Sequence, residues 1–424
     1  MKSFVYYTPT EVVFGPEAEE QVGALVRKHG GSRVLVHYGG QSAVRSGLMD
    51  KVCRQLDENG LTYFPLGGVV PNPRLSLVHE GIELVRREGI DFLLAVGGGS
   101  VIDSCKAIAY GVPYEGDVWD FFAGKAKVQK ALPVGVVLTL PASGSEMSDS
   151  CVITREDTQD KRGYSTPFGR CRFAVMNPER SFTLPPYQTA AGVTDIMMHT
   201  LERYFSREDD MDLTDGIAEA LLRSMMKNGL QVLEYPQDYR ARAQIMWGGS
   251  LSHNGLTECG LQRDWSCHKM EHELSGLFDV THGAGLAAIW PSWARYVYKD
   301  HLSRFAQFAV NVMGVEAGAA AAAAAGTCVG VAAGAGASDG AGVGTDAKAA
   351  DLETVALKGI EALEGFFRAI GMPVCMTELL GRTLTDAEIK ELARRCSRDG
   401  SITIGSLTVL HREDMENIYS AANH

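Results

Sequence analysis

The segment DFLLAVGGGSVID, at residues 91–103, sets the architecture of the first half of this sequence. Its residues 92–96 form a continuous apolar run, which is typical of a strand buried on both faces of a parallel sheet. Three glycines and a serine follow, and a helical pattern then continues through Ala109. A strand, a glycine turn and a helix together form the repeating unit of α/β domains. The segment therefore predicts a parallel sheet with helices on its faces.

The same alternation extends on both sides of this segment. Strand patterns occupy residues 32–38, 61–66 and 132–140, and helical patterns occupy residues 17–29, 48–59 and 75–88. At the N-terminus, the β-rich residues 4–7 and 11–14 are joined by Thr8-Pro9, which predicts a hairpin. Repeated strand–helix units with apolar strands predict a sheet covered by helices on both faces.

The pattern changes near Leu184, where Pro185 and Pro186 suit the start of a helix. Strand signals nearly disappear beyond this point. Helical runs are predicted at residues 187–205, 213–233, 239–253, 265–277, 285–297, 299–312 and 352–369. A chain of 424 residues is also long for one domain. We therefore predict an α/β domain over residues 1–185 and an all-helical domain over residues 186–424.

A low-complexity Ala/Gly segment interrupts the helical half at about residues 316–350. It contains an unbroken alanine run at residues 319–325 and Gly-Ala mixtures up to Gly344. Such a segment has little apolar surface to bury, so we expect a mobile surface insertion without a catalytic role.

The overall composition is that of an ordinary globular protein, with a net charge of -12 and a pI of about 5.4. No basic stripe is visible, which disfavours a nucleic-acid partner. The nine cysteines are scattered without a Cys-x-x-Cys pair, as in a reduced cytoplasmic chain. We expect no membrane partner, because no apolar run reaches spanning length and the N-terminus lacks a signal-peptide core.

Acidic and imidazole side chains gather in the helical half. Asp195 and His199 are four residues apart, which puts them on one face of a helix, and His268 and His272 repeat that spacing. Imidazoles and a carboxylate converging from two helices are suitable ligands for a divalent transition metal. Spacing alone does not distinguish such a site from ordinary buried histidines, and it does not separate His268 from His272.

The glycine turn after the strand at residues 91–96 is a candidate phosphate site. Glycine lets backbone N–H groups approach a phosphate, and the helix N-terminus that follows adds partial positive charge. The turn is not the Gly-x-Gly-x-x-Gly fingerprint of standard dinucleotide-binding folds. The segment at residues 139–146 brings hydroxyl groups to the same carboxyl edge of the sheet, where open α/β sheets bind ligands.

These segments together resemble the iron-containing (group III) alcohol dehydrogenases, specifically the butanol dehydrogenase-like branch. The matching pieces occur in the family's order, at residues 14–15, 96–103, 138–146, 192–204 and 265–283. The resemblance implies a Rossmann-like, dinucleotide-binding N-terminal domain followed by a helical metal-binding domain, as in the dehydroquinate synthase-like fold. It also implies an active site in the cleft between the two domains.

The resemblance assigns roles to the histidine cluster. It implies that the four metal ligands are Asp195, His199, His268 and His282. His272 corresponds to a family histidine near the nicotinamide, and it is our candidate for relaying a proton. His253 has no corresponding role, and we interpret it as structural.

The resemblance also implies a set of cofactor-binding residues. These are Gly97, Gly98, Gly99, Ser100 and Asp103 near the pyrophosphate and ribose, Thr139, Ser143 and Ser145 along the cofactor cleft, and Lys161 at a ribose. One branch of the family carries an acid after its second strand, which repels a 2′-phosphate. Here that place contains Gly39, Gly40 and Ser42 and no acid, so NADP is expected. The turn has no obvious arginine to bind the 2′-phosphate of NADP, so NAD is an alternative cofactor.

The implied activity is a metal-dependent, NAD(P)-linked interconversion of primary alcohols, such as butanol, and aldehydes. Either Fe²⁺ or Zn²⁺ would act as a Lewis acid on the substrate oxygen. Relatives of this branch are commonly dimers, so a homodimer is expected. The alternatives are a glycerol or polyol dehydrogenase of the same fold and, from a different class, a catalytically silent scaffolding subunit.

Overall fold

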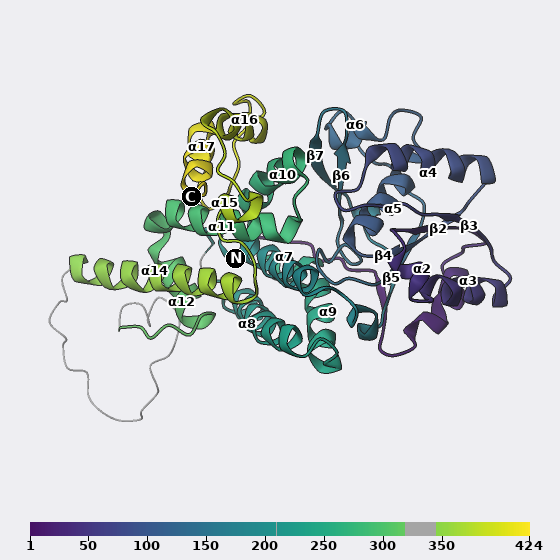
Figure 1. Ribbon diagram of the computed structural model, residues 1–424, viewed down its shortest axis with the longest axis horizontal. Coiled ribbons are helices and arrows are strands. Elements are labelled where there is room, and N and C mark those ends of the chain that lie inside the picture. The colour runs from purple at the N-terminus through teal and green to yellow at the C-terminus, as the bar shows by residue number, and fades with distance from the viewer. Residues whose placement is uncertain (209, 319–344) are drawn as a thin grey trace.

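The computed structural model describes residues 1–208, 210–318 and 345–424. The chain has two halves: an α/β half that contains the strands, and a helical half that contains both α7 and the C-terminus (Figure 1). In the described ranges, no helix is both long and apolar enough to cross a membrane.

A six-stranded parallel sheet forms the centre of the α/β half, in the order β1-β8-β5-β4-β2-β3. Its strands are β1 (Glu11–Phe14), β2 (Arg33–Tyr38), β3 (Thr62–Leu66), β4 (Phe92–Gly97), β5 (Val134–Leu138) and β8 (Phe173–Met176). The order reverses between β2 and β4, because β3 lies outside β2 and the chain then crosses back to β4. In open α/β sheets, ligands bind beyond the carboxyl ends of the strands at such a reversal.

Helices cover both faces of the sheet, as the apolar strand pattern predicted. They are α1 (Val22–Lys28), α2 (Ser42–Arg45), α3 (Leu48–Glu58), α4 (Leu75–Glu88), α5 (Gly99–Gly111) and α6 (Trp119–Phe122). Successive side chains of β4 point to opposite faces. Phe92 and Leu94 pack in the cluster that contains Val26 of α1, whereas Leu93 packs in the one that contains Ile82 of α4.

The predicted N-terminal hairpin is wrong. Residues 1–10 form no strand, and β1 pairs in parallel with β8, where Glu11 faces Phe173. The N-terminal segment instead reaches the helical half, where the Lys2 backbone N–H donates to the Gly260 carbonyl at 2.7 Å. The strand partner of β1 lies far along the chain, so the local Thr8-Pro9 turn signal could not identify it.

Three strands were not anticipated from the sequence: β8 and the two members of an antiparallel hairpin, β6 (Ser150–Arg155) and β7 (Asp160–Ser165). The hairpin packs between α5 of the α/β half and α10 of the helical half (Figure 1). It pairs Thr154 with Lys161.

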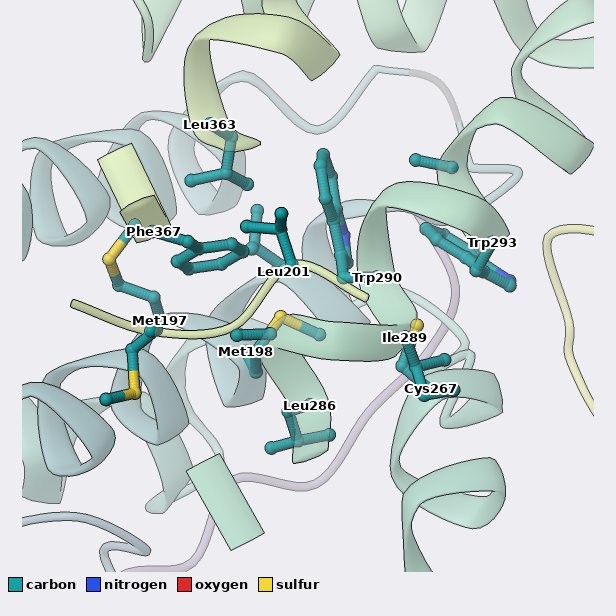
Figure 2. Close-up of a cluster of buried hydrophobic side chains, with 14 of the residues drawn as sticks. Met197, Met198, Leu201, Cys267, Leu286, Ile289, Trp290, Trp293, Leu363 and Phe367 are labelled. Atoms are coloured by element: carbon teal, nitrogen blue, oxygen red, sulfur yellow. The ribbon is translucent and has the colours of Figure 1, made fainter. Parts of the chain in front are cut away.

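The helical half is built around α7 (Pro186–Tyr204), which is buried at every residue from Thr189 to Tyr204. The other helices are α8 (Asp212–Glu234), α9 (Tyr239–His253), α10 (Ser266–Phe278), α11 (His282–Val297), α12 (Leu302–Asn311), α14 (Thr345–Ala369), α15 (Met376–Leu380), α16 (Asp386–Cys396) and α17 (Arg412–Ala421). Figure 2 shows Met198 and Leu201 of α7 packed near Trp290 of α11 and Phe367 of α14. A helix surrounded by apolar neighbours needs specific partners for any polar side chain that it carries.

Most of the predicted insertion, residues 319–344, lies outside the described residues. Helix α14 begins at Thr345, seven residues before the predicted start at Leu352. The last strand ends at Met176 and α7 begins at Pro186, and we retain residue 185 as a proposed domain boundary.

Candidate metal centre and cofactor site

Asp195 and His199 lie one turn apart in the middle of α7, and both are buried. His199 Nδ1 lies 2.8 Å from the Asp195 carbonyl oxygen and 3.1 Å from its carboxylate Oδ1. Because the Asp195 carbonyl oxygen can only accept a hydrogen bond, Nδ1 carries the ring proton. The lone pair of His199 is therefore on Nε2, where it can bind a metal.

His268 on α10 and His282 at the start of α11 approach the same carboxylate. His268 Nε2 lies 3.9 Å from Asp195 Oδ1, and His282 Nε2 lies 3.7 Å from it. The donor atoms of these three residues all lie within 4.8 Å of one another. The ring of His199 is adjacent, with its centroid 4.5 Å from that of His268, but His199 is not a member of this three-residue group.

Two atoms at this centre lack a hydrogen-bond partner in the described part of the chain: Asp195 Oδ1 and His268 Nε2. Burying a polar atom without a partner is unfavourable, and such atoms are rare in folded proteins. A divalent cation between the carboxylate oxygen and the imidazole nitrogens would satisfy both. The residues present therefore fit a metal ion.

Two glutamates contact the Nδ1 atoms of His268 and His282, the ring nitrogens that do not face Asp195. Glu202 accepts from the His268 backbone N–H at 2.8 Å and lies 3.0 Å from His268 Nδ1, while Glu271 is in close contact with His282 Nδ1. Carboxylates in this position fix the ring orientation and tautomer of metal-binding histidines. Neither Glu202 nor Glu271 is among the site residues predicted from the sequence. A signal was present for Glu202, which follows Asp195 by seven residues and so lies on the same helix face.

The environment of Glu202 makes its ionisation sensitive to a nearby cation. Burial, and then the charge of Asp264, raise the pKa of Glu202 to about 8. A divalent cation bound through His268 would favour the carboxylate and lower that pKa. Metal binding is therefore expected to become weaker as the pH falls, because the Glu202 carboxylate then takes up a proton.

Lys161 lies at the outer side of this network, away from Asp195. Strand β7 delivers its Nζ to 3.3 Å from Glu271 Oε2 and 3.3 Å from His282 Nδ1. Glu271, His272 and His282 form a second group with metal-ligand spacing. The Lys161 ammonium already neutralises Glu271, so we interpret this group as the outer part of the Asp195 centre. The predicted contact between Lys161 and a ribose of the cofactor stays a prediction.

His272 lies at the border of the cluster. It is half-buried, and its ring centroid is 5.8 Å from that of His282. Burial, and then the charge of Lys161, lower the pKa of His272 well below its usual value. The side chain is therefore neutral at physiological pH and able to accept a proton.

The glycine turn follows β4 and begins α5. The first residue of α5 is Gly99, and a Cβ at that position would overlap Ser143 Oγ. A Cβ at Gly98 would lie 3.1 Å from that of Leu140. The hydroxyl-rich segment at residues 139–145 thus packs directly on the turn, so the glycines are needed for this packing as well as for a close phosphate approach.

Asp103 uses both of its carboxylate oxygens within the protein. It accepts from Ser145 Oγ at 2.6 Å and from the Val152 backbone N–H at 3.0 Å. Asp103 and Ser145 thereby fix the shape of the segment above the glycine turn. Their predicted contact with the cofactor stays a prediction, as it does for Ser100 and Thr139.

The turn after β2 lies beside the end of β4, at the reversal of the strand order. Gly40 and Ser42 are exposed there, and the Gly39 carbonyl accepts from the Gly68 backbone N–H at 3.1 Å. Residues 38–45 contain no acidic side chain.

A parallel sheet with a glycine turn at its reversal, joined to a helical domain with a buried Asp–His cluster, is the arrangement expected of an enzyme that binds a nucleotide and a metal ion. Comparison with known proteins identifies the family. Residues 9–178 match the iron-containing alcohol dehydrogenase model, and residues 189–334 match the model of the C-terminal part of that family.

Individual relatives match over nearly the whole chain. An NADH-dependent butanol dehydrogenase A of Clostridium acetobutylicum is 39% identical, covering 99% of each chain. An NADPH-dependent aldehyde reductase of Escherichia coli is 31% identical over the full length of both. The crystal structure of an NADH-dependent butanol dehydrogenase A from Thermotoga maritima has a TM-score of 0.89 and 35% identity, covering 100% of this chain and 99% of the other.

The chain belongs to the iron-containing alcohol dehydrogenase family and to its butanol dehydrogenase-like branch. The predicted family, the predicted fold and the predicted class, an NAD(P)-linked alcohol dehydrogenase, are confirmed. The roles of the individual site residues stay predictions.

Proposed function

We propose that the chain interconverts primary alcohols of about the size of butanol with their aldehydes. Asp195, His199, His268 and His282 hold the metal in this proposal. The observation that carries it is the convergence of His268 Nε2 and His282 Nε2 on Asp195 Oδ1, which has no hydrogen-bond partner among the described residues. The names of the relatives, a butanol dehydrogenase and an aldehyde reductase, support the substrate class.

When bound, the metal supplies Lewis acidity to the substrate oxygen, and the nicotinamide exchanges a hydride with the substrate carbon. Glu202 and Glu271 keep the protons of His268 and His282 on Nδ1, away from the metal side. His272 accepts the hydroxyl proton during alcohol oxidation and returns it during aldehyde reduction. Its lowered pKa keeps the ring neutral, so a lone pair is available for a proton.

The direct test uses protein stripped of metal by a chelator. We measure reduction of butanal with NADPH, and in parallel with NADH, before and after adding Fe²⁺ anaerobically or Zn²⁺. Three imidazoles and a carboxylate suit either ion. Turnover should return with at least one metal, and the more effective metal identifies the working ion. If both cofactors bind and neither metal restores turnover, the proposed substrate is wrong, and polyols are tested next.

For the cofactor, we propose a preference for NADP over NAD. The support is the absence of an acid at residues 38–45, next to the reversal of the sheet. The named relatives include both NADH- and NADPH-dependent enzymes. The proposal is therefore specific to this chain and needs its own test.

Gly40→Asp tests the cofactor preference. Gly40 is exposed and a Cβ there meets no atom within 4 Å, so the substitution fits. Repulsion of the 2′-phosphate should raise the KM for NADPH about tenfold, which corresponds to about 1.4 kcal/mol, and leave the KM for NADH nearly unchanged. Gly40→Asn is the uncharged control. Equal changes with both cofactors, or a wild-type enzyme that prefers NADH, would contradict the proposal.

We also propose that the chain forms a homodimer. Strand β1 is at the edge of the sheet, and the segment that precedes it in the chain exposes the apolar side chains of Phe4, Val5 and Tyr7. Exposed edge strands with apolar neighbours favour association with another chain. Light scattering should give twice the mass of the chain, and Val5→Asp should lower the association constant.

A cytoplasmic location is the last part of the proposal. The eight described cysteines are free thiols, and most of them are buried. This state suits a reducing compartment. Cell fractionation would test the location.

A further inference from the structure

His253 connects the two halves of the site. It is the last residue of α9 and is 8% exposed. Its Nδ1 lies 2.7 Å from the Ser143 carbonyl oxygen, and its Nε2 lies 3.4 Å from Ser150 Oγ. Because a carbonyl oxygen only accepts, His253 Nδ1 carries the proton, and the Ser150 hydroxyl donates to Nε2. His253 is thereby fixed to both ends of the segment at residues 143–150.

The other face of His253 contacts a predicted metal ligand. Its ring centroid is 4.2 Å from that of His199, and the two ring planes are inclined by 31°. The ring of Trp265 closes this layer, at 5.8 Å from both His199 and His253 and 4.8 Å from His268. Stacking of this kind restricts ring rotation, so His253 limits the orientations available to His199.

The segment that His253 holds has little freedom of its own. Buried Lys106 donates through Nζ to the carbonyl oxygens of Ser145, Ser148 and Ser150, at 2.7, 3.0 and 2.8 Å. Gly144 has a φ of +63°, and a Cβ there would lie 2.5 Å from the Gly249 carbonyl oxygen of α9. These contacts restrain the segment along its length, between Ser143 at one end and Ser150 at the other.

Ser143 also belongs to the cofactor side, since it packs on Gly99 of the glycine turn. One continuous set of contacts therefore runs from Gly99 through Ser143 and His253 to His199. We propose that His253 is a positioning residue that couples nucleotide binding at the glycine turn to metal binding at the Asp195 centre.

This inference rests on the proposed function, because it needs both ligands to bind. If either ligand orders the shared contacts, the second binds to a site that is already ordered, and its affinity rises. Thermodynamic linkage requires the effect to be reciprocal: NADP⁺ must strengthen Zn²⁺ binding by the same factor by which Zn²⁺ strengthens NADP⁺ binding.

The experiment measures Zn²⁺ affinity of the chelator-stripped full chain by competition with a chromophoric chelator, with and without saturating NADP⁺. NADP⁺ affinity is measured by calorimetry, with and without Zn²⁺. For each ligand, we take the ratio of its affinity in the presence of the other ligand to its affinity in the absence of that ligand. In the wild type, both ratios should equal about 5 or more. His253→Gln keeps a donor for Ser143 but removes the stacking, and His253→Phe keeps the ring but removes the donor. Both ratios should fall toward 1 in each variant while Zn²⁺ still binds.

Ser252→Ala is the matched control. Ser252 precedes His253 on α9, is buried, and donates only within that helix, to the Gly249 carbonyl at 2.7 Å. It should keep the wild-type ratios. A wild-type ratio of 1, or His253 variants with the wild-type ratio, would overturn the inference even though Zn²⁺ binds. Failure of the wild type to bind Zn²⁺ would overturn the proposed function as well.

Discussion

Two buried histidines, one in each half of the molecule, have opposite hydrogen-bonding states. His37 near the end of β2 has both ring nitrogens paired: Nδ1 donates to the Leu66 carbonyl at 2.8 Å, and Nε2 accepts from Ser104 Oγ at 2.8 Å. His268 on α10 has Nδ1 paired with Glu202, while its buried Nε2 has no partner among the described residues. Complete pairing indicates a structural histidine, and an unpaired buried nitrogen aimed at a carboxylate indicates a ligand.

The largest effect should come from removing the unpaired nitrogen. His268→Ala deletes one proposed metal ligand, and a bound metal contributes several kcal/mol of transition-state stabilisation. Turnover should therefore fall by about 1,000-fold or more. The measurement is kcat with butanal and NADPH in saturating metal, together with the metal content of the purified variant. His37→Asn is the control, which should keep near-normal turnover per folded molecule. Near-normal turnover of His268→Ala would remove the contrast between the two histidines.

The second effect concerns stability and should be confined to His37. Burial lowers the pKa of His37 from 6.5 to about 4. The unfolded chain binds more protons than the folded chain between these values. The contribution of neutral, buried His37 to the free energy of unfolding is therefore fully present above pH 6.5, decreases as the pH falls, and is lost near pH 4. A shift of this size corresponds to about 3 kcal/mol.

Urea unfolding of the wild type and of His37→Gln between pH 7 and pH 4.5 checks this prediction. The difference in unfolding free energy between the two proteins should shrink as the pH falls, because only the wild type carries the buried titratable ring. Other histidines contribute equally to both proteins, so they cancel in the difference. A difference that stays constant across this pH range would show that His37 is not held neutral by burial.

The smallest effect should come from the partner of His268 rather than from His268 itself. Glu202→Gln keeps an oxygen acceptor near His268 Nδ1 but removes the negative charge. Loss of such an outer carboxylate typically weakens metal affinity by about 10- to 100-fold. Chelator competition measures this change. Glu219→Gln is the matched control, because Glu219 is also buried but accepts from Tyr204 Oη, at 2.9 Å, and contacts no predicted ligand. An equal loss in both variants would argue against a specific role for Glu202.

Local sequence patterns predicted most of the fold because they reflect local physics. The apolar run at residues 92–96 became the buried strand β4, and the four-residue spacing of Asp195 and His199 put both on one face of α7. The errors occurred where distant partners decide the structure. Strand β1 takes β8 as its neighbour across more than 150 residues, so the nearby turn signal at Thr8-Pro9 was misleading.

The candidate site likewise combines features set by local sequence with features set by contacts between distant parts of the chain. Sequence periodicity determined that α10 would present His268 and His272 on one face, and that a carboxylate and a histidine would share a face of α7. Spacing did not separate the two histidines of α10; the family resemblance implied His268 as the ligand, and the tertiary structure supplies the physical reason why His268 approaches Asp195. The packing of α10 against its neighbours places His268 Nε2 at 3.9 Å from Asp195 Oδ1, and it places His272 beside Glu271 and His282 instead. Helical spacing specifies a face, whereas the position of an atom along and across that face depends on the helices packed against it.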